Sequence, residues 1–215
     1  NIMIIEKFIR NPEVIDDFMD NCFYGTPKQH MRAQGSPRIN WLWDPYTTTN
    51  KFPQFSHVLL QRDNPRANSD FYPFFKTILK NFMRDNGLEY KRITRSCLNC
   101  TYHFPDYHCG DPHVDYPENH YTAILYLNNV EGSTYIFDKQ INYDEGSSTT
   151  GPGFAENNGI IPYETIDWEN DPIPVKHEAI PEKGKMVLFD GSHYHALCPT
   201  SPGDLRLICV YNITY

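Results

Sequence analysis

The sequence has no long hydrophobic run and no excess of basic residues. No apolar stretch approaches the ~20 residues of a membrane-spanning helix, and the short apolar start over residues 2–5 is followed at once by Glu6 and Lys7, unlike the core of a secretory signal. The 27 acidic residues outnumber 19 basic ones, for a formal net charge of -8, whereas proteins that hold phosphate backbones carry a basic surface. We therefore expect an intracellular, cytoplasmic protein whose partners are neither membranes nor nucleic acids.

The sequence does not call for a disulfide framework. The six cysteines are spread over 215 residues, a length that can bury a sizeable core without covalent staples, so we expect reduced thiols. Cys97 and Cys100 are spaced like half of a zinc or redox motif, with Cys109 nearby. Residues three apart on a strand face opposite sides, however, so this pair would chelate poorly and such a site is disfavoured.

Aromatic residues and prolines are abundant instead. The chain has 15 Tyr, 13 Phe, 3 Trp and 17 Pro, which favours short strands joined by many turns over a helix bundle. Its length lies within the range in which all-β sandwiches and barrels form one domain. The composition thus predicts a single domain over residues 1–215, mainly β with flanking helices (α+β).

Helical patterns are confined to the first part of the chain. An Asn-Pro start signal followed by apolar residues at helical spacing predicts a helix over about residues 12–23. A second apolar stripe begins at Phe71 and is closed by Gly87. We expect residues 1–87 to form a helical N-terminal support.

From residue 88 onward the pattern changes to short apolar or alternating runs separated by turn residues. Such a series predicts strands of a sandwich or jelly roll, with the helices packed outside it. The expected strands cover residues 88–104, 121–128, 134–138, 175–180, 185–190 and 205–213. We expect residues 88–215 to form this core.

One connection within the predicted core is unusually long. Residues 139–174 are rich in Gly, Ser, Thr, Pro and Asn and carry seven carboxylates and one lysine, and they exceed the ordinary length of a loop inside a domain. Two interpretations fit this insert: a lid that packs over a functional site, or a disordered loop. A lid of this charge would favour cationic or neutral substrates over polyanions.

Two short motifs supply candidate metal ligands. His113 and Asp115 are two residues apart, so on an extended chain both side chains point to one side and can touch one ion. The predicted strand over residues 185–190 runs into a turn that presents His193 and His195. Two histidines and one carboxylate on one face of a metal, with other positions open, are typical of non-haem Fe(II) oxygenases, whereas a structural zinc site closes its coordination.

The last predicted strand carries a charged residue among apolar neighbours. Arg206 shares one face of the strand with Ile208 and Val210. A buried guanidinium is costly unless a carboxylate or a phosphate pairs with it. A bound anionic ligand is one candidate partner. The alternative is an arginine at the strand edge that reaches solvent or a distant acid.

Taken in order, these motifs resemble the Fe(II)/2-oxoglutarate-dependent dioxygenases of the prolyl 4-hydroxylase-like branch. The resemblance covers about residues 90–213 and rests on the runs 113–117, 121–128, 132–137, 184–190 and 195–199, followed by Arg206. Two features depart from the family. Members commonly have Gly-Gly-Glu-Thr-x-Phe where this chain has Glu-Gly-Ser-Thr-Tyr-Ile-Phe over residues 131–137, and the insert is long.

The resemblance implies a double-stranded β-helix (jelly-roll) core that holds Fe(II) through His113, Asp115 and His195. His195 is preferred over His193 because the family's distal histidine stands just before a small residue and a proline. The resemblance also implies that Arg206 pairs with the distal carboxylate of 2-oxoglutarate.

Two tyrosines match further positions of the family. Tyr126, in a Tyr-Leu-Asn run, corresponds to a tyrosine that hydrogen-bonds the same carboxylate in some members. Tyr102 is similar to a tyrosine upstream of the His-x-Asp motif, although an offset of one residue would place His103 there. Both tyrosines are therefore candidate residues for binding the co-substrate.

The activity implied by the resemblance is hydroxylation of a C–H bond with Fe(II), 2-oxoglutarate and O2, with ascorbate as a candidate accessory reductant. The first expected substrate is a prolyl or other amino-acid residue in a peptide or protein, and a free amino acid or another small molecule is the alternative. A nucleobase demethylase is disfavoured by the acidic pI of 5.5 and by the lack of the second C-terminal arginine typical of that branch. A jelly roll that binds a ligand without catalysis is disfavoured because all three ligands and Arg206 occur together.

Overall fold

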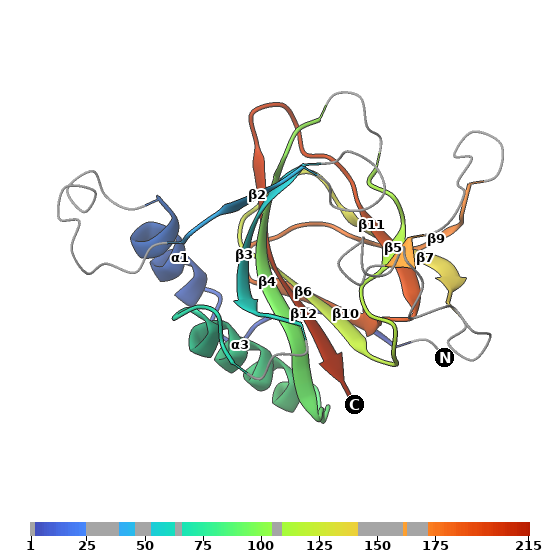
Figure 1. Cartoon of the computed structure of the whole chain (residues 1–215), viewed down its shortest axis with the longest axis horizontal. Helices are drawn as coiled ribbons and strands as arrows, with labels where there is room; N and C mark the ends of the chain where they lie inside the picture. Colours follow the sequence, from blue (N-terminus) through green and yellow to red (C-terminus); the bar gives the residue numbers. More distant parts are fainter. Residues whose placement is uncertain are drawn as a thin grey trace.

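Two antiparallel sheets, packed face to face, build the core of the computed structural model (Figure 1). The residues that the structure describes are 3–24, 39–45, 53–62, 66–104, 109–141, 161–162 and 172–215. No helix in this described part of the chain is long and apolar enough to span a membrane.

The larger sheet contains the long strands of the molecule. Its order is β1 (Ile4–Phe8), β10 (Lys185–Asp190), β6 (Tyr121–Tyr126), β12 (Leu205–Thr214), β4 (Arg92–Tyr102), β3 (Gln54–Leu60) and β2 (Leu42–Asp44). Each neighbouring pair is antiparallel. The central strand β12 alternates as the sequence predicts, because Ile208 and Val210 belong to the core between the sheets while Leu207 and Cys209 belong to the core beneath the helices.

The smaller sheet lies opposite and carries shorter strands. Its order is β8 (Ile161–Pro162), β5 (His113–Val114), β11 (His193–Leu197), β7 (Thr134–Gln140) and β9 (Val175–Ala179). From β5 to β7 and again from β9 to β12, the chain passes back and forth between the two sheets. This winding is the double-stranded β-helix, so the predicted jelly-roll core is confirmed.

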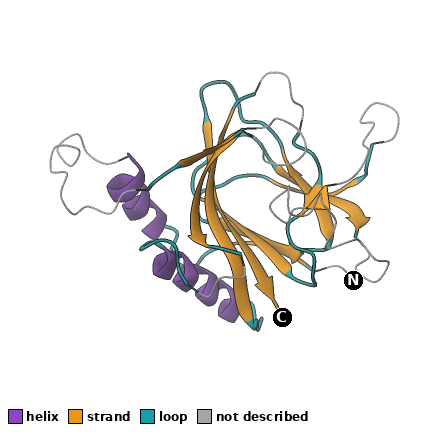
Figure 2. Ribbon diagram, in the orientation of Figure 1, coloured by secondary structure: helices purple, strands orange, loops and turns teal. Residues whose placement is uncertain are grey.

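The helices cover the face of the larger sheet that points away from the smaller one (Figure 2). α1 (Val14–Phe18) continues into the π-helical turn η1 (Met19–Tyr24), and α3 (Tyr72–Asp85) lies beside them. α3 is amphipathic, and Phe75 and Leu79 on its inner face have no exposed surface. Tyr211 of β12 donates a hydrogen bond to the carbonyl oxygen of Phe75 at 3.0 Å, which ties the helix to the sheet.

The first 87 residues contain strands as well as the two predicted helices. β1, β2 and β3 extend the larger sheet at both of its edges, whereas the sequence pattern indicated only helices there. The lid hypothesis for the insert over residues 139–174 falls mainly on residues 142–160 and 163–171, which lie outside the described part of the chain.

Candidate metal centre and adjoining pocket

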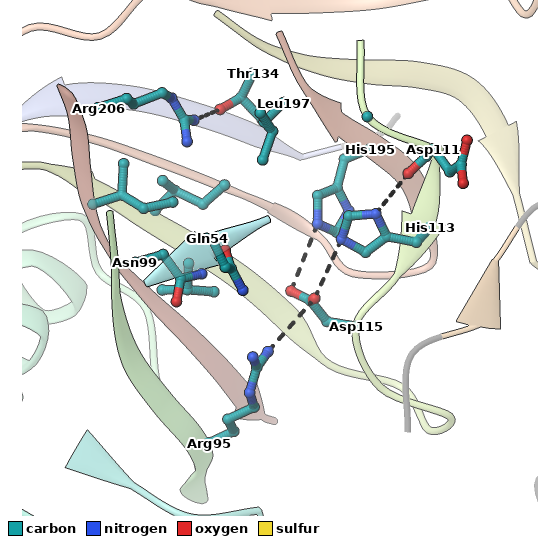
Figure 3. Close-up of a pocket in the computed structure, with 14 residues that line it drawn as sticks. Gln54, Arg95, Asn99, Asp111, His113, Asp115, Thr134, His195, Leu197 and Arg206 are labelled. Atoms are coloured by element: carbon teal, nitrogen blue, oxygen red, sulfur yellow. Dashed lines mark hydrogen bonds and ion pairs between the residues drawn. The ribbon is translucent and has the colours of Figure 1, made fainter. Parts of the chain in front are cut away.

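Three candidate ligands meet where the two sheets face each other. β5 and β11 pair so that His113 lies directly opposite His195, and Asp115 follows β5 immediately. The ligating atoms of the three side chains all lie within 4.8 Å of one another. Figure 3 shows the two imidazoles and the carboxylate converging on one small volume. Within the described residues, this is the one group of three or more His, Cys, Asp or Glu side chains placed to hold a metal ion.

The two imidazoles are oriented with one nitrogen toward the carboxylate. Nε2 of His113 lies 3.7 Å from Asp115 Oδ1, and Nε2 of His195 lies 3.6 Å from Asp115 Oδ2. On the opposite side, His113 Nδ1 donates a hydrogen bond to the carbonyl oxygen of Asp111 at 2.9 Å. A protonated Nδ1 leaves the lone pair of Nε2 free for a metal, which is the usual arrangement of a ligating histidine.

Burial and neighbouring charges favour the metal-binding protonation states of His113 and Asp115. Burial lowers the pKa of His113 to about 4, and the neighbouring His195 acts in the same direction. Burial alone would raise the pKa of Asp115, but His195 and Arg95 outweigh it and hold this pKa well below its ordinary value. A neutral imidazole beside an ionised carboxylate is the form that binds a divalent cation.

Three residues outside the triad hold Asp115 in place. Asn212 Nδ2 donates to Asp115 Oδ2 at 3.0 Å, and Arg95 Nη1 lies 3.7 Å from Oδ1. Arg62 Nη2 donates to the backbone carbonyl oxygen of Asp115 at 2.7 Å. Such supporting contacts orient a metal ligand and tune its affinity.

The sequence motifs did not point to these three supporting residues. The β12 alternation that marks Arg206 also places Asn212 on the same face, six residues further along. That signal could have found Asn212. The partners of Arg62 and Arg95 depend on which strands pair, which periodicity does not reveal.

His193 and His195 are separated by an irregularity in the strand. The pairing of β11 with β7 shifts register between them, so the two imidazoles do not point to one side as alternation would require. His193 is fully buried, and its Nδ1 donates to the carbonyl oxygen of Phe137 at 2.8 Å. The structure therefore brings His195 to Asp115, whereas His193 is hydrogen-bonded to β7 and does not belong to the group that could hold a metal.

Arg206 lines the same pocket as the triad, beside Thr134 (Figure 3). Its side chain is 1% exposed, and Nη2 donates to Thr134 Oγ1 at 2.6 Å. Its Nε and Nη1 make no hydrogen bond to the described residues. A guanidinium this deeply buried is costly without an anionic partner, and burial accordingly lowers its pKa. Burial excludes the solvent-reaching alternative, and none of the described carboxylates interacts with Arg206, so the geometry favours its anion-binding interpretation.

Tyr126 contacts Thr134, the residue that also accepts the hydrogen bond from Arg206. Its side chain is fully buried, and its hydroxyl lies 2.8 Å from Thr134 Oγ1 and 3.2 Å from the carbonyl oxygen of Ala179. The Arg206 guanidinium lies 5.6 Å from the centre of its ring. Tyr126 is not among the pocket-lining residues, so it reaches the pocket through Thr134.

Tyr102 points away from the pocket. Alternation along β4 directs Arg95 and Asn99 to the pocket and Tyr102 to the outer face. There its ring stacks on Trp43 with a centroid distance of 6.4 Å. His103, the alternative at a one-residue offset, contacts the carbonyl oxygen of Thr200 at 2.7 Å and does not line the pocket either. The structure therefore does not bring either residue to the site.

Cys97 and Cys100 are also kept apart. Cys97 belongs to the core between the sheets and Cys100 to the core beneath the helices, as expected for residues three apart on a strand. The described geometry gives no support to a zinc or redox site at this pair.

The remaining pocket wall is part apolar and part polar. Ile124, Ile208 and Val210 form an apolar side, while Gln54 and Asn99 add amides. The pocket thus has a candidate metal site at one place, a guanidinium without an ionic partner among the described residues at another, and an apolar surface between them. This combination fits a small anionic molecule that also reaches the metal.

The fold and the site together define a jelly-roll protein with the architecture of the 2-oxoglutarate-Fe(II) oxygenases. A prolyl-4-hydroxylase from Pseudomonas putida is similar over 99% of this chain and 92% of its own, with a TM-score of 0.50 and 12% identity. The epimerase SnoN, solved with Fe3+, alpha ketoglutarate and nogalamycin RO, is similar over 98% of this chain and 78% of its own, with a TM-score of 0.56 and 10% identity. No family model and no curated protein matches the sequence.

Proposed function

We propose that this protein is an Fe(II)- and 2-oxoglutarate-dependent dioxygenase that hydroxylates a C–H bond. One observation carries the proposal: the His113, Asp115 and His195 triad lines the same pocket as the Arg206 guanidinium, whose Nε and Nη1 make no hydrogen bond to the described residues. The triad alone would fit many metals, and the arginine alone would fit many anions. Their combination fits a 2-oxoacid that also carries a distal carboxylate.

The residues present fit both cofactors. Two imidazole nitrogens and one carboxylate oxygen, all from one side, are the donor set of non-haem Fe(II) oxygenases and leave positions for further ligands. The Nε and Nη1 groups of Arg206 make no hydrogen bond to the described residues, so N–H donors of this guanidinium remain for a carboxylate. Between these two ends, the side chains of Ile124, Ile208 and Val210 suit the methylene groups of 2-oxoglutarate.

The chain contributes binding and positioning to the reaction. When bound, Fe(II) with 2-oxoglutarate and O2 supplies the oxidation of C–H to C–OH, with succinate and CO2 as the other products. Arg206 and Thr134 orient the distal carboxylate of the co-substrate. Asn212 and Arg95 fix the Asp115 carboxylate. The apolar wall excludes water from the space between them.

For the substrate, we propose a prolyl or other amino-acid residue in a peptide or protein. The likeness to a prolyl-4-hydroxylase over most of both chains supports this choice. A free amino acid or another small molecule is the second candidate, and the likeness to SnoN, which was solved with nogalamycin RO, favours it. The excess of acidic over basic residues disfavours polyanionic substrates such as nucleic acids.

Formation of succinate from 2-oxoglutarate tests the activity. The protein, loaded with Fe(II) without oxygen and then exposed to air, is incubated with proline-containing peptides, free amino acids or nucleosides. We expect Fe(II)-dependent succinate that increases with one substrate class, together with one added oxygen atom in that substrate by mass spectrometry. Folded protein that binds Fe(II) but consumes no 2-oxoglutarate under any of these conditions would contradict the proposal.

A further inference from the structure

Two thiols far apart in the sequence are in contact beside the pocket. The Sγ atoms of Cys109 and Cys198 lie 2.7 Å apart, although 89 positions separate the residues. Both side chains are partly exposed, whereas Cys97, Cys100 and Cys209 are buried. Neither cysteine has a role in the proposed dioxygenase reaction.

The backbone, and not only the side chains, holds the two thiols together. β5 and β11 pair at His113 and His195, and the same antiparallel approach continues to a hydrogen bond from Gly110 N to Leu197 O at 2.8 Å. Cys109 and Cys198 flank that hydrogen bond. The thiol contact therefore follows from sheet pairing and recurs whenever the sheet is formed.

The two thiols differ in their tendency to ionise. A hydrogen bond from Cys198 lowers the pKa of Cys109, because it stabilises the Cys109 thiolate. The same contact raises the pKa of Cys198, which burial raises further. The pair therefore contains one favoured nucleophile and one thiol positioned to react second.

We propose that Cys109 and Cys198 form a reversible intramolecular disulfide by exchange with a low-molecular-weight disulfide such as oxidised glutathione. The Cys109 thiolate attacks one sulfur of glutathione disulfide, a mixed disulfide forms and one glutathione leaves as its thiolate, which takes up a proton. Cys198 loses its proton and attacks the Cys109 sulfur, and the second glutathione leaves in the same way. The two protein thiols are oxidised, and one glutathione disulfide is reduced to two glutathione molecules.

The disulfide would fasten the two segments that carry the histidine ligands. Cys109 lies four residues before His113, and Cys198 lies three residues after His195. Gly110 and Leu197, the residues adjacent to the two thiols, line the pocket. The bond would also close a long loop in the unfolded chain, so the oxidised protein should unfold at a temperature roughly 5–15 °C higher than the reduced protein.

Mass spectrometry of the oxidised protein tests the disulfide. The full chain is reduced, freed of reductant, incubated with oxidised glutathione, blocked with an alkylating agent and digested. We expect a cross-linked peptide pair that contains Cys109 and Cys198, the loss of these two free thiols, and their return with dithiothreitol. The rise of the unfolding temperature is measured on the same samples.

Matched variants separate this pair from other thiols. Cys109→Ser and Cys198→Ser should each abolish the cross-link, and Cys198→Ser should retain glutathione on Cys109. Cys22→Ser removes another partly exposed thiol and should behave like wild type. Glutathione that remains on wild-type Cys109 without a cross-link, or a cross-linked protein whose unfolding temperature is unchanged, would overturn the inference. None of these measurements depends on dioxygenase activity.

Discussion

A single residue, Arg206, links the sequence pattern to the proposed chemistry. On its strand it looks like a misplaced charge among Ile208 and Val210, and the structure keeps it buried, with its Nε and Nη1 making no hydrogen bond to the described residues. A protein whose interior contained this charge only for stability would gain from replacing it. Its position in the same pocket as the candidate metal ligands is explained if it binds an anionic ligand there.

Replacing Arg206 should separate binding from stability. We expect Arg206→Met to raise the KM for 2-oxoglutarate by about tenfold or more, because losing a charge-assisted pair costs roughly 1.5–3 kcal/mol. Without co-substrate, the unfolding temperature of the variant should equal or exceed that of wild type, since an uncompensated buried charge is gone. Steady-state kinetics and calorimetry measure the two quantities.

The exposed Arg84 serves as a control for the loss of a guanidinium, because its side chain is 59% exposed and, among the described residues, forms an ion pair only with its neighbour Asp85. Arg84→Met should change neither quantity. An unchanged KM in Arg206→Met, or a large fall in its unfolding temperature, would show that Arg206 has a structural role within the protein instead.

Asp115 is the only anionic member of the triad, so its removal should have the largest effect on metal binding. We expect Asp115→Ala to weaken the binding of Mn(II), a non-oxidising substitute for Fe(II), by more than about 100-fold and to abolish turnover. Titration calorimetry measures the affinity. Asp138→Ala, which removes an exposed carboxylate paired with Lys176, is the control. Full turnover in Asp115→Ala would refute the proposed site.

At the scale of elements, the turn between β10 and β11 sets the direction of β11, the strand that carries the candidate ligand His195. Gly191 lies in this turn, and its N–H donates to the carbonyl oxygen of His120 at 2.8 Å. A Cβ at this position would collide with the His120 imidazole, which is fully buried. The close approach explains why this position is a glycine.

Gly191→Ala should therefore lower both the stability of the protein and its affinity for metal. Moving His120 within a packed site should cost about 1–3 kcal/mol, which lowers the unfolding temperature by roughly 2–12 °C. Metal affinity should fall as well, because His195 follows four residues later. Gly110→Ala is the matched control, since its Cβ would meet Leu197 at an ordinary 3.6 Å. Equal unfolding temperatures for the two variants would disprove the steric explanation.

Elements with a strong periodic pattern could be predicted from the sequence. The apolar stripe of α3 and the alternation of β12 both carry enough residues to define a face, and they locate the second helix and Arg206. β1 and β3 escaped prediction because their runs are short and without clear alternation. They become strands by pairing with β10 and β4, which are distant in the sequence. Tyr102 is the opposite case. Its place in the sequence suggested that it binds the co-substrate, but the alternation along β4 directs it away from the pocket.

The choice between His193 and His195 illustrates the same limit at the site itself. Simple alternation puts both imidazoles on one side of the strand. The irregularity in the β11 and β7 pairing separates them, and such an irregularity depends on the neighbouring strand. The resemblance to a family favoured His195, whereas the residues alone left both histidines open.

At the scale of the whole molecule, a small ion cluster joins the two sheets near the first strand. Glu6 of β1 pairs with Lys185 of β10 at 2.8 Å in the larger sheet and with His177 of β9 in the smaller one. Lys185 is only 7% exposed and also pairs with Glu182 at 2.7 Å. The cluster thus connects β1, which is distant in sequence from the core strands, to both layers.

The charge on Glu6 makes this connection dependent on pH. Burial raises the pKa of Glu6, but Lys185 and His177 together outweigh it, so the pKa lies below the ordinary value of 4.5. A carboxyl group with a lowered pKa in the folded state stabilises the protein above the unfolded pKa, and this contribution is lost as the pH falls through the folded pKa. The stabilisation should therefore be complete near neutral pH and disappear in acid.

Glu6→Gln tests this connection between the sheets. At pH 7 the variant should unfold at a temperature roughly 2–4 °C below wild type, which corresponds to about 1 kcal/mol for a partly buried ion cluster. The difference should shrink as the pH falls below 4.5 and approach zero once the pH has passed the lowered pKa of Glu6, because wild-type Glu6 is then protonated as well. Thermal unfolding followed by circular dichroism across this range measures it. The control is Asp138→Asn, which breaks an exposed pair with Lys176 inside the smaller sheet; its unfolding temperature at pH 7 should differ little from that of wild type. If the difference for Glu6→Gln persists unchanged in acid, the effect arises from packing, not from charge.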